Sequence, residues 1–310
     1  HGHISKGLEF LALDFEKYGE FSMNICHNPG LNPPLIKDST VFATAVVTYC
    51  LRFCDEVMAK KLNKRAVEFL LSLMQADGLW SYWTPRSGKS ITPDLDDTAC
   101  ISRLLFDFGV DELFPNLNRQ KFFNHQNKEG WFFTWFNKAY ELNDVDSVVN
   151  ANVIWYLGEL PETERAIKNL IKIVAKGNEE SSYWYYLNPF SLYYAISRAA
   201  CAGAPKLKSV FHIIYERISS RLGDLSQQFD PLTLGLGLCT LANIGLVDTN
   251  LSKNIAQKIC KVQNPSGSWE AVAFYGGPEP PGPLSVWFGS NALTTAFCIE
   301  GLSRVNRHGT

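Results

Sequence analysis

The sequence predicts an all-α fold, a single (α/α)6 toroid in which about twelve helices form two concentric rings. Three observations predict it. A segment type marked by a glycine recurs six times at intervals of 44 to 59 residues, and a more apolar segment type alternates with it. In addition, 46% of the 310 residues are hydrophobic, which is enough for a large core. We therefore expect residues 1–310 to form one domain.

The glycine-marked segments are the expected outer helices. Glycine is favoured where a helix ends because it adopts a left-handed conformation without a Cβ clash. The copies are centred on Gly19, Gly78, Gly130, Gly177, Gly223 and Gly267. Residues 65–74 and 254–262 carry their charges on one face, as expected of helices that cover a core.

The alternating segments are the expected inner helices. They are apolar almost all round, which suits a helix buried on every side, and each has a polar or acidic residue near its start. They cover residues 38–51, 94–105, 144–157, 188–200, 230–245 and 288–302. We expect these helices to run parallel with their N-termini on one rim. An open solenoid is the alternative, but no polar capping repeat is apparent, which favours a closed ring.

The composition excludes several classes of partner and location. The net charge of −2 gives no basis for binding nucleic acid or an anionic membrane. The eight cysteines form no C-x-x-C pair, so we expect free thiols in a reducing, cytoplasmic compartment. We expect no signal peptide, and the sequence has no run of about 18 apolar residues that could span a membrane.

The start of the second inner helix is unusually acidic, with Asp94, Asp96 and Asp97 in four positions. Carboxylates this close cannot all ionise, so one retains its proton and becomes a candidate acid. The helix N-terminus acts in the opposite direction and favours carboxylate. Ordinary capping by Asp94 or Thr92 is the alternative interpretation.

The repeats and the acidic stretch resemble one family. Gln263-x3-Gly267-x-Trp269 fits the Q-x3-G-x-W repeat of squalene and terpenoid cyclases, and variants begin at Gln75 and Gln126. The stretch D-L-D-D-T-A at residues 94–99 matches the D-x-D-D-T-A motif of class II terpene cyclases. Over most of its length the chain therefore resembles the terpenoid cyclase/prenyltransferase superfamily.

This resemblance implies an isomerase- or lyase-type terpene cyclase that acts on a hydrophobic isoprenoid or prenylated substrate. Asp96 would be the general acid that protonates a carbon–carbon double bond or an epoxide, with Asp94 and Asp97 in support. Protonation would need no cofactor, and Mg²⁺ would be involved only if the substrate is a diphosphate. The zinc ligands of protein prenyltransferases find no convincing match.

Aromatic faces stabilise carbocations by cation–π attraction, and aromatic clusters follow several of the expected outer helices. We expect Tyr82, Trp83, Trp287 and Phe288 to line the substrate pocket. The resemblance implies a structural role, tying helices together, for the repeat tryptophans Trp80, Trp131 and Trp269.

We also count Asp146, Asn150 and Arg86 among the expected substrate-binding residues. Asp146 and Asn150, in the next inner helix, could hold the acid in orientation, and Asn150 and Asn152 could equally bridge neighbouring helices. Asp144 and Asp146 could instead bind Mg²⁺ or Ca²⁺ together with the first acidic group. Arg86 could bind a diphosphate head group or neutralise the nearby aspartates.

One toroid leaves the pocket without a second wall, since class II cyclases normally place it between two. A homodimer, a partner protein or the Gly/Pro-rich residues 276–283, expected to lack regular structure, could supply it. Peripheral contact with a membrane would bring an isoprenoid substrate. The alternative functions are an (α/α)6 glycosidase-like or metal-dependent enzyme that uses the acidic rim, and a non-catalytic toroid that binds an isoprenoid or a protein.

Overall fold

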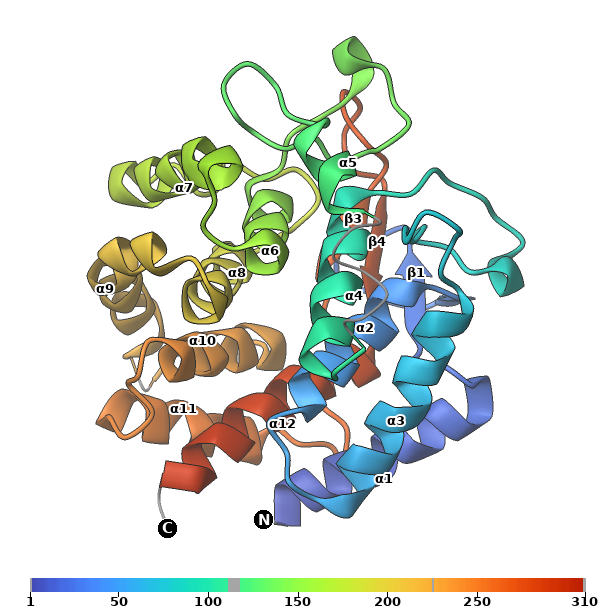
Figure 1. The fold of residues 1–310 in the computed structure, drawn as a ribbon. Coiled ribbons are helices and arrows are strands. Elements are labelled where there is room, and N and C mark those ends of the chain that lie inside the picture. The colour runs from blue at the N-terminus through green and yellow to red at the C-terminus, as the bar shows by residue number, and fades with distance from the viewer. Residues whose placement is uncertain (1, 111–117, 225, 309–310) are drawn as a thin grey trace.

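The computed structural model describes residues 2–110, 118–224 and 226–308, and twelve α-helices lie within them (Figure 1). The inner helices are α2 (Val41–Leu51), α4 (Leu95–Asp107), α6 (Ser147–Leu157), α8 (Pro189–Ala202), α10 (Pro231–Asn243) and α12 (Asn291–His308). The outer helices are α1 (Gly2–Tyr18), α3 (Val57–Ser72), α5 (Arg119–Phe123), α7 (Glu164–Lys176), α9 (Phe211–Leu222) and α11 (Asn250–Lys261). Short 3₁₀ helices are η1 (Pro85–Ser87), η2 (Tyr140–Leu142), η3 (Pro161–Thr163) and η4 (Pro205–Val210).

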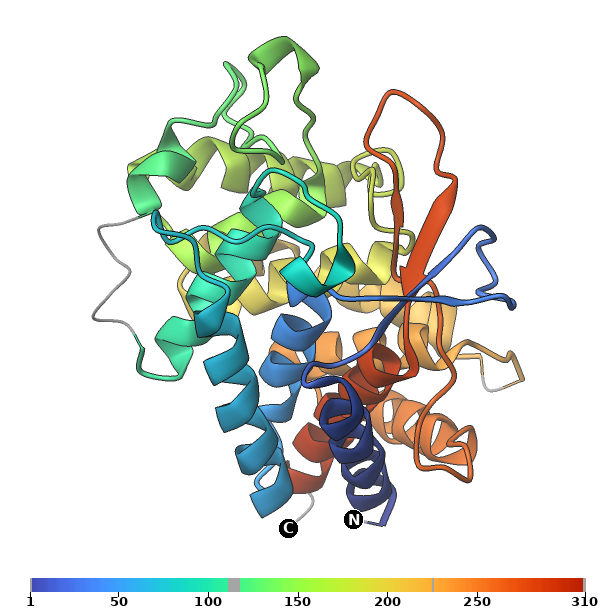
Figure 2. The same cartoon turned by 90° about the vertical axis from the view of Figure 1, so that its right-hand side faces the viewer.

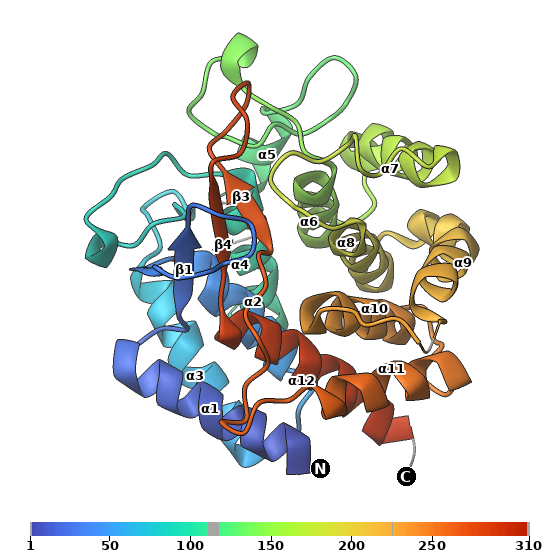
Figure 3. The ribbon, with the colours of Figure 1, turned by 180° about the vertical axis from the view of Figure 1, so that it is seen from behind.

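The inner helices form a closed ring. Each packs against the next in the chain, and α12 packs against α2, so the last inner helix meets the first. Seen from behind, α12 also lies along α1, which begins the outer layer (Figure 3). The α/α toroid predicted from the repeats is therefore confirmed. Within the described residues, no helix has both the length and the apolar character needed to cross a bilayer.

A small antiparallel sheet departs from the all-α prediction. Its strands are β1 (Met23–Cys26), β2 (Ile36–Asp38), β3 (Tyr275–Gly277) and β4 (Val286–Gly289), in the order β2-β1-β4-β3. Strand β1 pairs with β4, so the sheet joins segments from opposite ends of the chain (Figure 2). Gly276 and Gly277 belong to β3, which corrects the expectation that the whole Gly/Pro-rich stretch lacks regular structure. Local sequence patterns do not reveal pairing over such a separation.

Inner helices begin at side chains that cap them. A cap oxygen accepts a hydrogen bond from a backbone N–H of the first turn, which otherwise has no partner. Asp94 Oδ1 accepts from Asp97 N at 2.7 Å, and Asp230 Oδ1 accepts from Thr233 N at 2.8 Å. Thr40, Asp146, Asn188 and Ser290 cap α2, α6, α8 and α12 in the same way. Asp94 is thus the helix cap, one of the two candidates for that role.

Trp80 and Trp269 each tie one outer helix to the inner helix that follows it. Trp80 Nε1 donates to Leu70 O of α3 at 2.9 Å, and its backbone N–H donates to Thr98 Oγ1 of α4 at 3.2 Å. Trp269 repeats both bonds, to Ile259 O of α11 at 2.8 Å and to Thr295 Oγ1 of α12 at 3.0 Å. The structural role expected of these two residues agrees with their contacts.

The third repeat is shifted by one residue. Phe132, which is fully buried, donates its backbone N–H to Asn150 Oδ1 at 2.8 Å, so it occupies the place that Trp80 and Trp269 occupy elsewhere. Trp131 is only partly buried. The expectation that Trp131 takes the structural position is therefore wrong, because the turn before it presents the next side chain to the core.

Candidate active site

A pocket of about 530 Å³ lies where α2, α4 and α6 begin. Phe42, the aspartates of α4 and Val149 of α6 form its floor, which places these three N-termini on one rim. Tyr275, Val286 and Phe288 from β3 and β4 close another side. The sheet therefore supplies the wall that a single ring of helices lacks.

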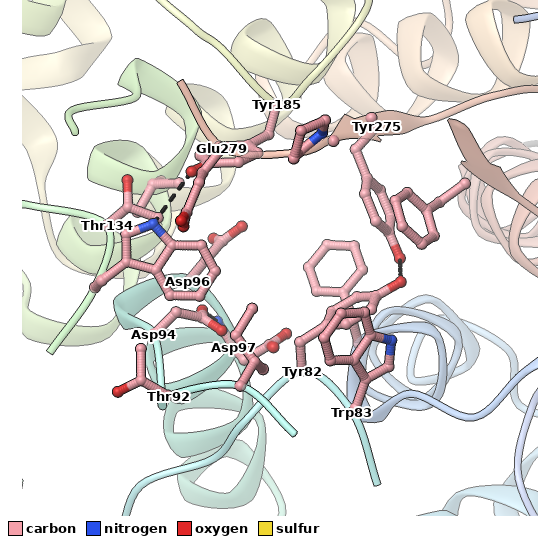
Figure 4. Close-up of a pocket in the computed structure, with 18 of the residues that line it drawn as sticks. Tyr82, Trp83, Thr92, Asp94, Asp96, Asp97, Thr134, Tyr185, Tyr275 and Glu279 are labelled. Carbon is pink, nitrogen blue, oxygen red and sulfur yellow. Dashed lines mark hydrogen bonds between the residues drawn. The ribbon is translucent and has the colours of Figure 1, made fainter. Parts of the chain in front are cut away.

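Figure 4 shows the three aspartates on one side of this pocket and the hydroxyl pair of Tyr82 and Tyr275 on the other. The two hydroxyl oxygens are 2.7 Å apart, so one hydroxyl donates a hydrogen bond to the other. Most of the remaining lining is aromatic or apolar. The pocket thus sets carboxyl groups against a surface with few polar partners for a ligand.

Each aspartate has a different set of contacts. Asp94 is engaged as the helix cap. Asp96 Oδ1 accepts from Asn152 Nδ2 at 2.7 Å, and Asp96 Oδ2 accepts from the Tyr186 hydroxyl at 2.6 Å. Both carboxyl oxygens of Asp97 are buried and accept no hydrogen bond from the described residues. The Asp97 carboxyl group can form a hydrogen bond with the neighbouring Asp94 only when it is protonated and acts as the donor.

Burial has the largest effect on the pKa values of the three aspartates. It raises the pKa of Asp94 to about 7, with a further contribution from Asp96. Burial and the charge of Asp94 raise the pKa of Asp97 well above its usual range. Burial also raises the pKa of Asp96, but hydrogen bonds from Tyr186 and Asn152 act in the opposite direction. Of the three, Asp96 combines exposure to the pocket with hydrogen-bond donors that stabilise the carboxylate left after proton transfer.

These shifts predict an unusual pH dependence of stability. An unfolded Asp titrates near pH 3.9, whereas folded Asp94 keeps its proton up to about pH 7. The native state then binds more protons than the unfolded chain, so the free energy of unfolding falls as pH rises from about 4 to 7. Each retained proton contributes up to about 1.4 kcal/mol per pH unit.

Asp94→Asn tests this directly, because Asn caps a helix as well as Asp does. We expect urea unfolding between pH 4 and 8 to show that the free energy of unfolding of the variant increases relative to that of the wild type as pH rises. Asp77→Asn, which removes an exposed carboxylate outside the pocket, is the control. If the free energy of unfolding depended on pH in the same way in the wild type and in Asp94→Asn, the raised pKa of Asp94 would be contradicted.

Three of the expected aromatic residues line the pocket, namely Tyr82, Trp83 and Phe288. Trp83 Nε1 donates to Asp38 Oδ2 at 2.8 Å, which fixes the indole at the pocket edge. Trp287 does not line the pocket, and this is a correction. It lies beside Phe288 in β4, and successive side chains of a strand point to opposite faces.

Arg86 is also placed outside the pocket, where it cannot bind a ligand held there. It donates to the backbone carbonyl of Tyr18, and its Nη1 lies 3.3 Å from Glu20 Oε1. Both interpretations of Arg86 are therefore corrected: the carboxylate that it neutralises is Glu20, and not one of the aspartates of the acidic helix.

Asp146 and Asn150 support the pocket and do not line it. Besides capping α6, Asp146 Oδ2 accepts from the backbone N–H groups of Trp184 and Tyr185 at 2.6 and 3.0 Å. Asn150 bonds both backbone groups of Phe132. The expectation that these two residues contact a substrate is corrected, because their polar atoms are used by the backbone of neighbouring loops.

Asp144 is likewise engaged, since its carboxylate accepts from Thr134, Trp135 and Tyr185. Among the residues described, no three His, Cys, Asp or Glu side chains are grouped so as to hold a metal ion. Asn152 bridges two inner helices, as one interpretation expected, because it donates a hydrogen bond from α6 to Asp96 on α4.

Several lining residues had no signal in the sequence. Lys138 and Glu279 face each other at the pocket, with Nζ and Oε2 3.2 Å apart, although 141 positions separate them in the chain. Tyr186 lay within an aromatic cluster, but nothing distinguished it from Tyr183 or Tyr185. Its role depends on where the loop before α8 meets α4.

No family model matches this chain, and no curated protein matches its sequence. Solved structures share its fold. A protein from Actinoplanes is similar over 98% of this chain and 99% of its own, with a TM-score of 0.76 and 17% identity. A variant of the type II terpene cyclase MstE from Scytonema, in complex with geranylgeranyl dihydroxybenzoate, is similar over 99% and 97%, with a TM-score of 0.71 and 16% identity.

An unsaturated glucuronyl hydrolase specific for heparin is similar over 99% of this chain and 97% of its own, with a TM-score of 0.60 and 12% identity. Identities this low establish a shared fold, a terpene cyclase-like α/α toroid, and leave the reaction to the residues of the pocket.

Proposed function

We propose that this protein is a class II, protonation-initiated terpene cyclase-like enzyme, with Asp96 as its general acid. One observation carries the proposal. The Asp96 carboxyl group opens onto an aromatic pocket while Tyr186 and Asn152 hold its two oxygens, and two further buried carboxyl groups crowd it. This arrangement keeps protons in the cluster and gives one of them a stabilised conjugate base.

The reaction balances without a cofactor. The O–H bond of Asp96 breaks as a C–H bond forms on a substrate double bond, leaving a carboxylate and a carbocation. Ring closures move the cation along the chain. Loss of a proton from carbon to solvent or a base ends the cascade and regenerates an alkene, and a proton from solvent returns Asp96 to its acid form. Tyr82, Trp83 and Phe288 would stabilise the cation through their ring faces, at about 0.5–2 kcal/mol each.

One toroid is enough for such a site. The strands that carry Tyr275 and Phe288 line one side of the pocket within a single chain, so this wall need not come from a second copy. The similarity to MstE supports this, because one toroid of this length corresponds to 97% of that cyclase.

The proposal is tested by incubating the protein with squalene, farnesyl and geranylgeranyl diphosphate, and a geranylgeranylated hydroxybenzene, and identifying products by mass spectrometry. A ring-closed isomer or hydrate of any of them supports it. If a folded protein converts none of them, these substrates are excluded and the proposal loses its main prediction.

The charges of the pocket predict which head group is accepted. Among the described residues that line it, Lys138 is the one cation, and it is already paired with Glu279. A diphosphate would bring negative charge into a pocket whose described lining offers no unpaired cation, and burying a charge without a partner costs several kcal/mol. We therefore expect kcat/KM to be at least about tenfold higher for a neutral prenylated hydroxybenzene than for the matching diphosphate.

EDTA is expected to leave the preferred reaction unchanged. Lys138→Gln serves as a further check, since it should weaken any residual turnover of the diphosphate more than that of the neutral substrate. Equal, Mg²⁺-dependent turnover of the diphosphate would contradict this head-group preference while leaving proton-initiated cyclisation intact.

The second candidate is a glycosidase-like reaction, favoured by the fold shared with the glucuronyl hydrolase. Paired carboxyl groups at a toroid rim suit it. Sugar hydroxyls, however, need several polar partners, whereas the wall opposite the aspartates is formed by Tyr275, Val286 and Phe288. Release of unsaturated uronate from heparin fragments, lost in Asp96→Asn, would favour this candidate over the cyclase.

A further inference from the structure

A line of hydrogen bonds connects the candidate acid to a buried cation. Arg198 Nη2 on α8 donates to Asn152 Oδ1 on α6 at 2.8 Å, and Asn152 Nδ2 donates to Asp96 Oδ1 on α4 at 2.7 Å. The three residues lie on three successive inner helices. None of the pocket chemistry above uses Arg198, which does not line the pocket.

Arg198 is placed to keep its charge in the interior. Its side chain stacks on Trp155, with the guanidinium carbon 3.7 Å from the ring centroid, and Tyr49 and Tyr194 flank it at 4.9 and 5.1 Å. The residue is 6% exposed, and within the described residues it forms no ion pair. The nearby Glu300 is paired instead with Arg304, at 3.0 Å.

A buried cation without a paired carboxylate is costly. The carboxyl group to which its hydrogen bonds lead is that of Asp96, one amide away. Accepting from Arg198 fixes the Asn152 amide so that its NH₂ group faces Asp96. The amide therefore holds the carboxyl in place and transmits the polarising effect of the cation to it.

We propose that Arg198, acting through Asn152, is a positioning residue that strengthens Asp96 as an acid. This inference rests on the proposed function. Burial and crowding keep the proton on the aspartates, and the Arg198–Asn152 line stabilises the carboxylate that remains when Asp96 gives its proton away.

The groups that bear on Asp96 set the direction of the expected shift. Burial favours the neutral form of Asp96, whereas hydrogen bonds from Tyr186 and Asn152 and the charge of Arg198 favour its charged form. The facing groups are Asp94, Asp97 and Cys100 on its own helix, Asp146 at the start of α6, Tyr186 in the loop before α8, and Arg198 on α8.

Arg198→Met tests the proposal, because it removes the cation and keeps an unbranched apolar side chain against Trp155. The rate of a reaction that needs protonated Asp96 falls as pH rises through its pKa. Losing Arg198 raises that pKa, so the falling limb of the kcat profile should move to higher pH by about one unit. The plateau rate should drop by about tenfold because the acid is weaker, with KM unchanged.

Two variants separate this from a packing effect. Arg198→Lys should restore part of both changes, since it keeps a cation at the site. Arg103→Met is the matched control: Arg103 also lies over Trp155, at 6.0 Å, but pairs with Asp107 and does not contact Asn152. A rate loss in Arg198→Met without any movement of the pH limb would overturn the proposal.

Infrared titration gives a readout that needs no substrate. The C=O stretch of protonated Asp96, assigned by its loss in Asp96→Asn, should persist to higher pH in Arg198→Met and in Asn152→Leu than in the wild type. If the titration of Asp96 is unchanged in both variants, the proposed effect of Arg198 through Asn152 is overturned. Because this measurement is independent of turnover, it tests whether Arg198 acts on Asp96 through Asn152 even if the proposed cyclisation fails.

Discussion

Asp96→Asn is expected to lower kcat for cyclisation by about 10²- to 10⁴-fold, the usual contribution of a general acid, in a protein that stays folded. The amide is isosteric but has no acidic proton. Tyr186 can still donate to the amide oxygen, whereas the Asn152 NH₂ group loses its acceptor. The helix cap is Asp94, not Asp96, and it is unchanged. Loss of activity would therefore reflect the missing proton and not a lost cap.

The measurement is product formation by mass spectrometry under single-turnover conditions, together with the unfolding midpoint of each variant. Asp230→Asn is the matched control, since Asp230 caps α10 as Asp94 caps α4 but does not line the pocket. Full activity of Asp96→Asn combined with inactivity of Asp97→Asn would move the acid to Asp97. Full activity in both would exclude each of them as the acid and leave these two aspartates with structural roles.

Trp80→Ala is expected to reduce the free energy of unfolding by about 3–5 kcal/mol. The side chain is fully buried, and truncation leaves a cavity between α3 and α4 and removes the indole hydrogen bond to the Leu70 carbonyl, which keeps only its backbone bond from Leu73. Both the packing and the hydrogen bond that join an outer to an inner helix are then lost.

Trp131→Ala is the matched control and should cost about 1 kcal/mol, the centre of the distribution for single substitutions. Trp131 is only partly buried, because Phe132 takes the structural position in that repeat. Chemical denaturation of the two variants side by side distinguishes them. Equal losses would mean that the repeat is in register with Trp131 after all.

The helices were predictable because their signals are local. Asp94 was a candidate cap, and the helix begins at Leu95; Asp230 stood before an apolar run, and that helix begins at Pro231. Alternation of apolar and amphipathic helices predicts two layers, since only a helix enclosed by others can be apolar all round. Six repeats of this kind were sufficient to predict the toroid.

Pairs of adjacent aromatic residues were not resolved by sequence. Trp131 and Phe132, and Trp287 and Phe288, are equally good candidates in composition. Which member faces inward depends on the turn that precedes it or on strand pairing, and β4 is aligned by β1 from the far end of the chain. A shift of one residue exchanges the two faces.

The sequence by itself determined the ring of helices and the acidic residues at the start of one of them. Only the tertiary structure decided what surrounds the acid: Asn152 and Tyr186 on its two oxygens, and Arg198 behind Asn152. The physical reason is rotational. Each residue advances a helix by about 100°, so the side chain that faces a neighbouring helix is fixed by how the helices pack, and no local pattern records it.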